Sequence, residues 1–181
     1  MLFKPAESCF LIIDAQQKLL DKIKDKRLVV KTIIKIIEIF KTFEKPVIVS
    51  EQYPKGLGNT VKKISDNLPS NCFNFEKTVF SCFKSPIFVK HLTKFKIERV
   101  VICGIESHIC VLQTALDLKQ QGYEPFVVIE GINSRNTNDK KTALKRMEKE
   151  NINLLTFEML LFEFIEDSKN PKFKKIVKLV T

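Results

Sequence analysis

The chain has 181 residues, of which 44% are hydrophobic and 29% charged, the composition of an ordinary globular protein with a sizeable core. No apolar run approaches the roughly 18 residues that a membrane span needs, and the N-terminus lacks a signal-peptide pattern, so we expect neither. Five cysteines without a CxxC pair argue against a disulfide framework or a zinc ribbon and favour a reducing, cytoplasmic compartment.

The net charge of +10 raises the question of a nucleic-acid or membrane partner. Only four of the 31 basic residues are arginines, and the lysines are scattered through every predicted helix instead of forming one stripe with aromatic side chains. We therefore interpret the charge as a solvated basic surface, and we expect neither nucleic acid nor a membrane as a partner.

Short apolar runs alternate with amphipathic helical patterns along the whole chain. The apolar runs predict strands at 9–14, 46–50, 74–80, 100–103, 126–131 and 153–157. The helical patterns lie at 17–43 with a break near Asp25, weakly at 61–70, and then at 86–95, 107–122, 136–151, 159–166 and 171–180. The glycine-bearing segment 51–60 is expected to be a loop.

This alternation predicts an α/β fold in a single domain, residues 1–181. Right-handed crossovers lead to a three-layer, Rossmann-like fold with a six-stranded parallel sheet in the order 3-2-1-4-5-6 and helices on both faces. The first and fourth strands then meet at the topological switch point. A ligand crevice is expected above Asp14 and Gly104, which follow those two strands.

The stretch from Arg99 to Gly122 contains a candidate nucleophile. A buried strand ends at Gly104, Ser107 is a candidate N-cap, and the helix that follows should end at Gly122 as its C′ residue. Cys110 then lies in the first helical turn, where free amides and the helix dipole favour a thiolate with a lowered pKa. The alternative is a small buried core cysteine, which is the commoner case.

Two further polar residues end predicted strands. Asp14 closes the first strand and Lys77 lies near the end of the third, although an N-cap and a solvent lysine are the ordinary interpretations. With Cys110, they would place an acid, an ammonium and a thiol at one edge of the sheet.

The chain also resembles a known family, the isochorismatase-like cysteine hydrolases, nearly from end to end. The matching motifs are Asp-x-Gln at Asp14 and Gln16, EQYPKGLG at 51–58, EKTVFSCF at 76–83, GIESHIC at 104–110 and SRN from Ser134. The tail from Asn170 to Leu179 is similar to the branch of isochorismatase domain-containing proteins.

The resemblance implies a catalytic triad of Asp14, Lys77 and Cys110. It also implies a cis peptide between Ile105 and Glu106, which would direct the Glu106 and Cys110 amides into an oxyanion hole. By this analogy, Asp14 takes the thiol proton, Lys77 stabilises the thiolate and Cys110 attacks the substrate. Further residues are candidates for the substrate pocket: Gln16, Tyr53, Leu57 and His108.

A metal site of the nicotinamidase kind is not expected, because the chain has only His91 and His108. We expect no cofactor. His108 could contact substrate, or it could be a surface histidine at the start of a helix.

The predicted function is a metal-independent cysteine hydrolase acting on a small amide, ureido or ester-like substrate through a covalent Cys110 intermediate. One alternative is a catalytically weak or inactive binding or scaffold protein on the same fold. Another, a nucleotide-dependent oxidoreductase or nucleic-acid enzyme, is disfavoured because no GxGxxG motif occurs. The apolar segment from Met159 to Ile165 exceeds what one helix face can bury, which predicts a homo-oligomer.

Overall fold

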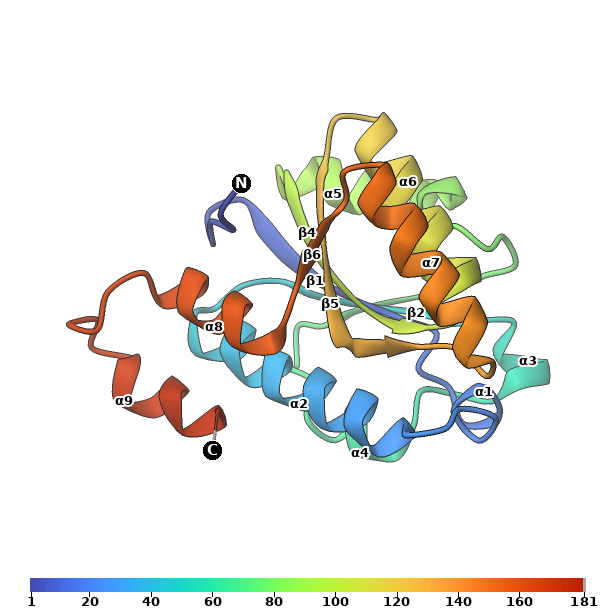
Figure 1. Ribbon diagram of the computed structural model, residues 1–181, viewed down its shortest axis with the longest axis horizontal. Coiled ribbons are helices and arrows are strands. Elements are labelled where there is room, and N and C mark those ends of the chain that lie inside the picture. The colour runs from blue at the N-terminus through green and yellow to red at the C-terminus, as the bar shows by residue number, and fades with distance from the viewer. Residues whose placement is uncertain (181) are drawn as a thin grey trace.

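The computed structural model, which describes residues 1–180, contains one six-stranded sheet (Figure 1). Its strands are all parallel and follow the predicted order, β3-β2-β1-β4-β5-β6. In chain order they are β1 (Ser8–Ile13), β2 (Val47–Gln52), β3 (Phe73–Lys77), β4 (Arg99–Ile105), β5 (Glu124–Asn133) and β6 (Asn153–Leu155).

Helices cover both faces of the sheet, as predicted (Figure 1). One face carries α2 (Lys26–Thr42), α8 (Phe157–Ile165) and α9 (Phe173–Ile176), which continues into the 3₁₀ turn Val177–Leu179. The other face carries α5 (Pro86–Lys94), α6 (Leu112–Gln120) and α7 (Thr137–Lys149). Short helices follow the first two strands: α1 (Gln17–Leu20), α3 (Pro54–Leu57) and α4 (Lys62–Ser65). Within residues 1–180, no helix is both long and apolar enough to cross a membrane.

The alternation of side chains along β1 divides the core into two layers. Phe10 and Ile12 pack into the cluster beneath α2 and α8, whereas Cys9, Leu11 and Ile13 pack toward α5 and α6. All five side chains are fully buried. A strand that is apolar on both faces is what a central parallel strand requires, so β1 lies in the middle of the sheet.

Several element boundaries differ from the sequence-based expectation. The break expected near Asp25 within 17–43 is confirmed: the segment forms α1 and α2, and Asp25, which has a left-handed φ of +56°, is the N-cap residue of α2. The expected loop 51–60 contains the end of β2 and all of α3. β5 is longer than expected, whereas β3 and β6 are shorter.

The last strand ends early because the next helix is capped. The Thr156 hydroxyl accepts a hydrogen bond from Met159 N at 3.2 Å, and Glu130 Oε2 accepts one from Phe157 N at 3.0 Å. These bonds satisfy free amides of the first turn of α8. Phe157, expected in a strand, is therefore the first residue of this helix.

Gly104 sets the distance between the two central strands. It pairs with Ile13 across β1 and β4 and has a φ of +130°, and a Cβ atom at this position would collide with the Ile13 carbonyl. Only glycine combines this conformation with this close approach. The contact brings Asp14, which follows Ile13, beside the segment that leaves β4.

Candidate active site

Asp14 is held in the left-handed region, with a φ of +50°, immediately after β1. Its amide donates to the Ser50 carbonyl at 3.1 Å, and the Ser50 hydroxyl donates to Asp14 Oδ1 at 2.7 Å. The carboxylate is fully buried. Both contacts come from the end of β2, so the neighbouring strand fixes the backbone and the side chain of Asp14 together.

Lys77 ends β3, and its ammonium reaches across β2 to Asp14. The Nζ–Oδ2 distance of this ion pair is 2.7 Å, and both side chains are inaccessible to solvent. Lys77 Nζ also donates to Gln52 Oε1 at 2.7 Å and contacts the carbonyl oxygens of Val79 and Phe80 at 3.3 and 3.1 Å. Such a set of acceptors compensates for removing an ammonium from water.

Cys110 follows β4 in a single π-helical turn, Ser107–Val111, that leads into α6. The peptide bond between Ile105 and Glu106 is cis, at the position that the family resemblance implied. The expected N-cap is wrong: Glu106 takes that position, and Ser107 lies inside the turn with a buried hydroxyl that has no hydrogen-bond partner within the described residues. A π turn places the first side chains differently from the regular helix that the sequence pattern predicted.

The Cys110 thiol lies close enough to Asp14 for the carboxylate charge to act on it. Burial raises the pKa of the Asp14 carboxyl, and the contacts with Lys77, Ser50 and Cys110 oppose that increase. Burial acts against the charged form of Lys77, but Asp14, Cys82 and Cys110 outweigh it, and the net pKa of Lys77 is raised. The carboxylate thus lies between an ammonium and a thiol.

The expected lowering of the Cys110 pKa is wrong for the free protein. Burial raises the pKa of the thiol, the Asp14 charge adds to the increase, and Lys77 offsets only part of it. The side chain is 7% exposed. Desolvation and a neighbouring negative charge outweigh the position in the first helical turn, so the resting group is a thiol.

Gln16, a candidate for the substrate pocket, is a buried residue whose side chain hydrogen-bonds to two other segments of the chain. Its Nε2 donates to the carbonyl oxygens of Gln52 and Gly58, and its Oε1 accepts a hydrogen bond from the Gln52 amide at 2.7 Å. Both amide hydrogens of Gln16 are used in these bonds and its side chain is fully buried, so Gln16 binds the backbone of Gln52 and Gly58. It connects the segment after β1 with the end of β2 and with the loop after α3.

Tyr53 lines a cavity of about 420 Å³ that also reaches Lys77. This cavity lies between the ends of β2 and β3 and the start of α5, where Ser85 and Pro86 contribute to its wall. The lining of this cavity does not include the pocket candidate Leu57 or the candidate nucleophile Cys110. It also does not include Asp14 and Gly104, above which the crevice was expected. The cavity therefore opens on the β3 side of the triad and does not open directly above β1 and β4.

The two histidines lie in separate places. His108 Nδ1 is 2.9 Å from the Ser134 hydroxyl, and its Nε2 is 3.8 Å from Asp139 Oδ2 on α7. His91, on α5, stacks on Phe73 with ring centroids 3.9 Å apart. His108 is thus joined to the SRN motif and α7, and within residues 1–180 no three His, Cys, Asp or Glu side chains form a group that could hold a metal ion.

Three residues near Asp14 and Lys77 were not predicted from the sequence: Ser50, Gln52 and Cys82. Ser50 holds Asp14, and Gln52 holds Lys77. Cys82 lies within electrostatic range of Asp14 and Lys77, and its backbone amide donates a hydrogen bond to the Thr114 hydroxyl at 2.9 Å. A signal existed for the first two: they are polar residues at the end of a strand that the predicted order places between the strands of Asp14 and Lys77.

Asp14, Lys77 and Cys110 thus lie at the carboxyl edge of a doubly wound parallel sheet, the edge at which such sheets bind their ligands. The family model for the isochorismatase domain matches residues 8–159. Isochorismatase domain-containing protein 2 of Xenopus laevis is 34% identical over 174 residues, which cover 96% of this chain and 83% of that protein. The chain therefore belongs to the isochorismatase family, and its fold is a hydrolase fold.

Solved structures give the same result for the fold. A structure titled MAR1 ribonuclease from Caenorhabditis elegans is 36% identical, with a TM-score of 0.94 over 99% of this chain and 92% of that one. YcaC from Escherichia coli, described as an octameric hydrolase of unknown specificity, is 20% identical and has a TM-score of 0.91 over 99% of this chain and 89% of its own. At that identity, the second likeness concerns the fold alone.

Proposed function

We propose that this protein is a metal-independent cysteine hydrolase that acts on a small amide, ureido or ester-like substrate through a covalent Cys110 intermediate. The observation that carries the proposal is the buried Asp14 carboxylate, which is held by the Lys77 ammonium at 2.7 Å and lies within electrostatic range of the Cys110 thiol. A base near a nucleophile, itself held by a third group, is the arrangement that nucleophilic catalysis requires.

The raised pKa values suit a concerted first step. The Cys110 sulfur attacks the substrate carbon while its proton passes to Asp14, whose own raised pKa makes it a better proton acceptor than a surface aspartate. Lys77 balances the negative charge that moves from carboxylate to sulfur and substrate oxygen. No preformed thiolate is needed, so a protonated resting cysteine is compatible with this scheme.

The next steps return every group to its starting state. The tetrahedral intermediate expels the amine or alcohol, which takes the proton from Asp14 and leaves a thioester on Cys110. Water, deprotonated by Asp14, then attacks the thioester and releases the acid and the thiol. We assign the developing oxyanion to two backbone amides, that of Glu106 in the cis peptide and that of Cys110 in the π-helical turn that follows.

The cavity beside Lys77 supports a small substrate. A volume of about 420 Å³ lies at the lower end of the range for small-molecule sites. Its wall contains the Tyr53 ring, and Glu76 and Lys84 supply charges of both signs. Tyr53, which is 55% exposed, is the residue we assign to substrate contact, because it borders both solvent and the triad lysine.

The experiment is a panel of small amides, ureido compounds, carbamates, esters and nitriles, with Cys110→Ala as the test variant and Cys72→Ala as the control. We expect turnover of at least one class, an acyl adduct on Cys110 in the mass spectrum of a quenched reaction, and a rate loss of roughly 10³-fold or more in Cys110→Ala. Full activity of Cys110→Ala would contradict the proposal.

A binding or scaffold protein is the second candidate function, and one observation favours it. Cys110 is 7% exposed and does not line the cavity that reaches Lys77, so the nucleophile is poorly accessible in this conformation. A pocket closed to substrate is what an inactive member of the fold would have. Absence of turnover across the panel, together with failure of small electrophiles to label Cys110, would support this candidate.

The ribonuclease title of the C. elegans structure does not carry over easily. A large basic groove, lined by Lys26, Lys31 and Lys63 among others, does not include Asp14, Lys77 or Cys110 and has no aromatic lining on which bases could stack. Incubation of the protein with a labelled single-stranded RNA tests this activity directly. Cleavage that Cys110→Ala abolishes would overturn the small-substrate assignment.

A further inference from the structure

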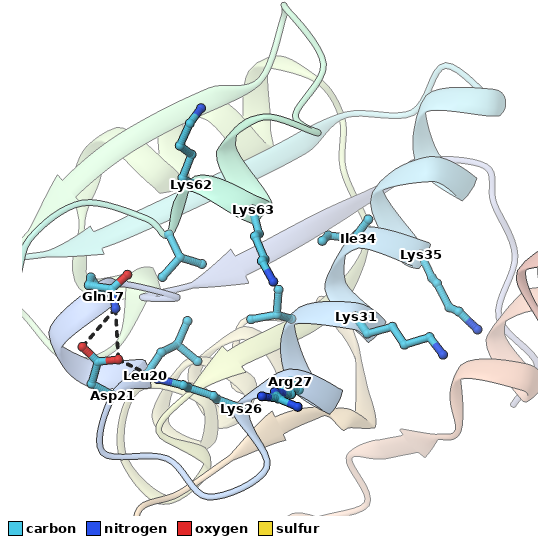
Figure 2. A pocket seen from close by; sticks show the side chains of 12 residues that line it. Gln17, Leu20, Asp21, Lys26, Arg27, Lys31, Ile34, Lys35, Lys62 and Lys63 are labelled. Atoms are coloured by element: carbon cyan, nitrogen blue, oxygen red, sulfur yellow. Dashed lines mark hydrogen bonds and ion pairs between the residues drawn. The ribbon is translucent and has the colours of Figure 1, made fainter.

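A groove of about 720 Å³ lies between α1, α2 and α4, away from the candidate active site (Figure 2). Its apolar floor consists of Leu20, Val30, Ile34 and Val61. Its rim carries six cationic side chains: Lys26, Arg27, Lys31, Lys35, Lys62 and Lys63. Figure 2 shows Lys63 pointing from α4 into the groove, opposite the row of cations on α2.

Most of this positive charge has no counterion within the described residues. The one acid of the groove, Asp21, already pairs with Lys26 at 2.7 Å and accepts hydrogen bonds from Gln17. No carboxylate contacts Arg27, Lys31 or Lys63 in the part of the chain that the structure describes. Burial and the neighbouring Lys31 lower the pKa of Lys35. The groove therefore suits an apolar surface edged with carboxylates.

The chain itself carries such a surface on α8. Met159 and Phe162, one turn apart, are 46% and 45% exposed although the rest of the helix is mostly core. Glu158 precedes this apolar pair in the first turn of α8, and Glu166 follows it as the C-cap residue of the helix. Neither glutamate side chain has a partner within residues 1–180. We call these four residues the acidic α8 face.

The groove and the acidic α8 face belong to the same helical layer. Both α4 and α8 pack against α2 (Figure 1). Lys35, at one end of the groove, lies over the ring of Phe157, the first residue of α8, at 5.2 Å. The cationic, apolar groove thus ends beside the first turn of the helix that carries the acidic α8 face.

We propose that a second copy of this chain binds to this helical layer, with the acidic α8 face of each copy in the groove of the other. A two-fold axis between them makes both contacts at once, because an isologous interface pairs each half of a self-complementary surface with the opposite half. The pairing buries Met159 and Phe162 against the groove floor and neutralises the unpaired lysines with unpaired glutamates. This proposal gives the homo-oligomer that the sequence predicts a specific interface. It does not depend on the proposed hydrolase activity.

The test uses charge reversal in two separate places. Lys31→Glu with Lys63→Glu reverses the groove, and Glu158→Lys with Glu166→Lys reverses the acidic α8 face. Each double variant should dimerise with a dissociation constant about tenfold or more above that of the wild type, measured by sedimentation velocity over a range of concentrations. Lys141→Glu with Lys145→Glu on α7 is the matched control for the change in net charge, and it should dimerise like the wild type.

Mixing the two reversed variants gives the decisive measurement. In the mixed dimer both contacts are again between opposite charges, so we expect the dissociation constant of the mixture to return toward that of the wild type, whereas each variant alone keeps its weaker association. Equal melting temperatures exclude misfolding. A monomeric wild type at the highest soluble concentration, an oligomer unaffected by either reversal, or no recovery on mixing would overturn the proposal. Binding of a single-stranded oligonucleotide or of anionic vesicles to the groove of a monomeric protein would do so as well.

Discussion

Asp14 and Lys77 act on the Cys110 thiol with opposite signs. The Asp14 charge raises the pKa of the thiol, and the Lys77 charge lowers it. A carboxylate beside a thiol is both a proton acceptor and a like charge, so the residue types alone do not fix the effect of removing Asp14 on the reactivity of Cys110. The structure decides the direction of this effect in the free protein. Burial and the Asp14 charge together raise the pKa of the thiol by more than Lys77 lowers it, so removing Asp14 should lower that pKa.

Replacing Asp14 with Asn should therefore speed the alkylation of Cys110 by iodoacetamide at near-neutral pH, although the same change should abolish hydrolysis. The reason is that the Lys77 charge is then unopposed, and each unit by which the thiol pKa falls increases the thiolate fraction about tenfold. Lys77→Met should slow the alkylation. In the wild type, the rate should keep rising with pH without levelling off below 9, the ordinary pKa of the thiol.

Cys72 serves as the internal control for this measurement. Burial alone raises its pKa to about 12, and it is half-buried and remote from both charges, so its labelling rate should not change in either variant. Mass spectrometry of partially labelled native protein separates the two sites. Slower labelling of Cys110 in Asp14→Asn would contradict the electrostatic argument.

At the scale of the elements, the carboxyl ends of β1 and β2 depend on Gln16. Its side chain satisfies the Gln52 amide and the carbonyl oxygens of Gln52 and Gly58. Thr60, in the same loop, is fixed separately by Glu51, which accepts hydrogen bonds from its amide at 2.6 Å and from its hydroxyl at 2.8 Å. The loop that carries Tyr53 is thus held at both ends.

Gln16→Leu should lower the free energy of unfolding by roughly 2–4 kcal/mol, because it leaves a buried amide and two carbonyl groups without partners. The neighbouring Gln17 is exposed, and Gln17→Leu should change the stability by no more than about 0.5 kcal/mol. Urea denaturation of both variants checks this. An equal effect of the two substitutions would mean that the Gln16 contacts contribute little.

The strands were predicted correctly where apolar runs are continuous, and less well at their ends. β1, β2 and β4 lie within two residues of their expected positions. Phe157 was misplaced because an apolar run continues from β6 into α8, so the boundary depends on capping by Thr156 and Glu130. Gly122 was predicted correctly as the C′ residue of α6, with a φ of +87°, because a helix end that needs this conformation favours glycine.

For the whole molecule, we expect that dialysis against a chelator leaves hydrolase activity unchanged. The physical reason is the donor set, since the chain has only two histidines, and one is stacked on Phe73 while the other contacts Ser134. Activity is measured before dialysis, after it, and after addition of zinc or iron. Loss of activity that one of these metals restores would show that another set of ligands holds a functional ion.

The sequence by itself determined the strand order and the three elements that carry Asp14, Lys77 and Cys110, because apolar periodicity is local and the handedness of parallel crossovers leaves few arrangements. The tertiary structure alone decided that the pKa of the Cys110 thiol is raised, because a pKa depends on burial and on distances between groups far apart in the chain. It also decided that Gln16 binds backbone, and that the scattered lysines of α2 and α4 converge on one groove. Convergence of this kind depends on how helices pack, which a one-dimensional pattern of charges does not contain.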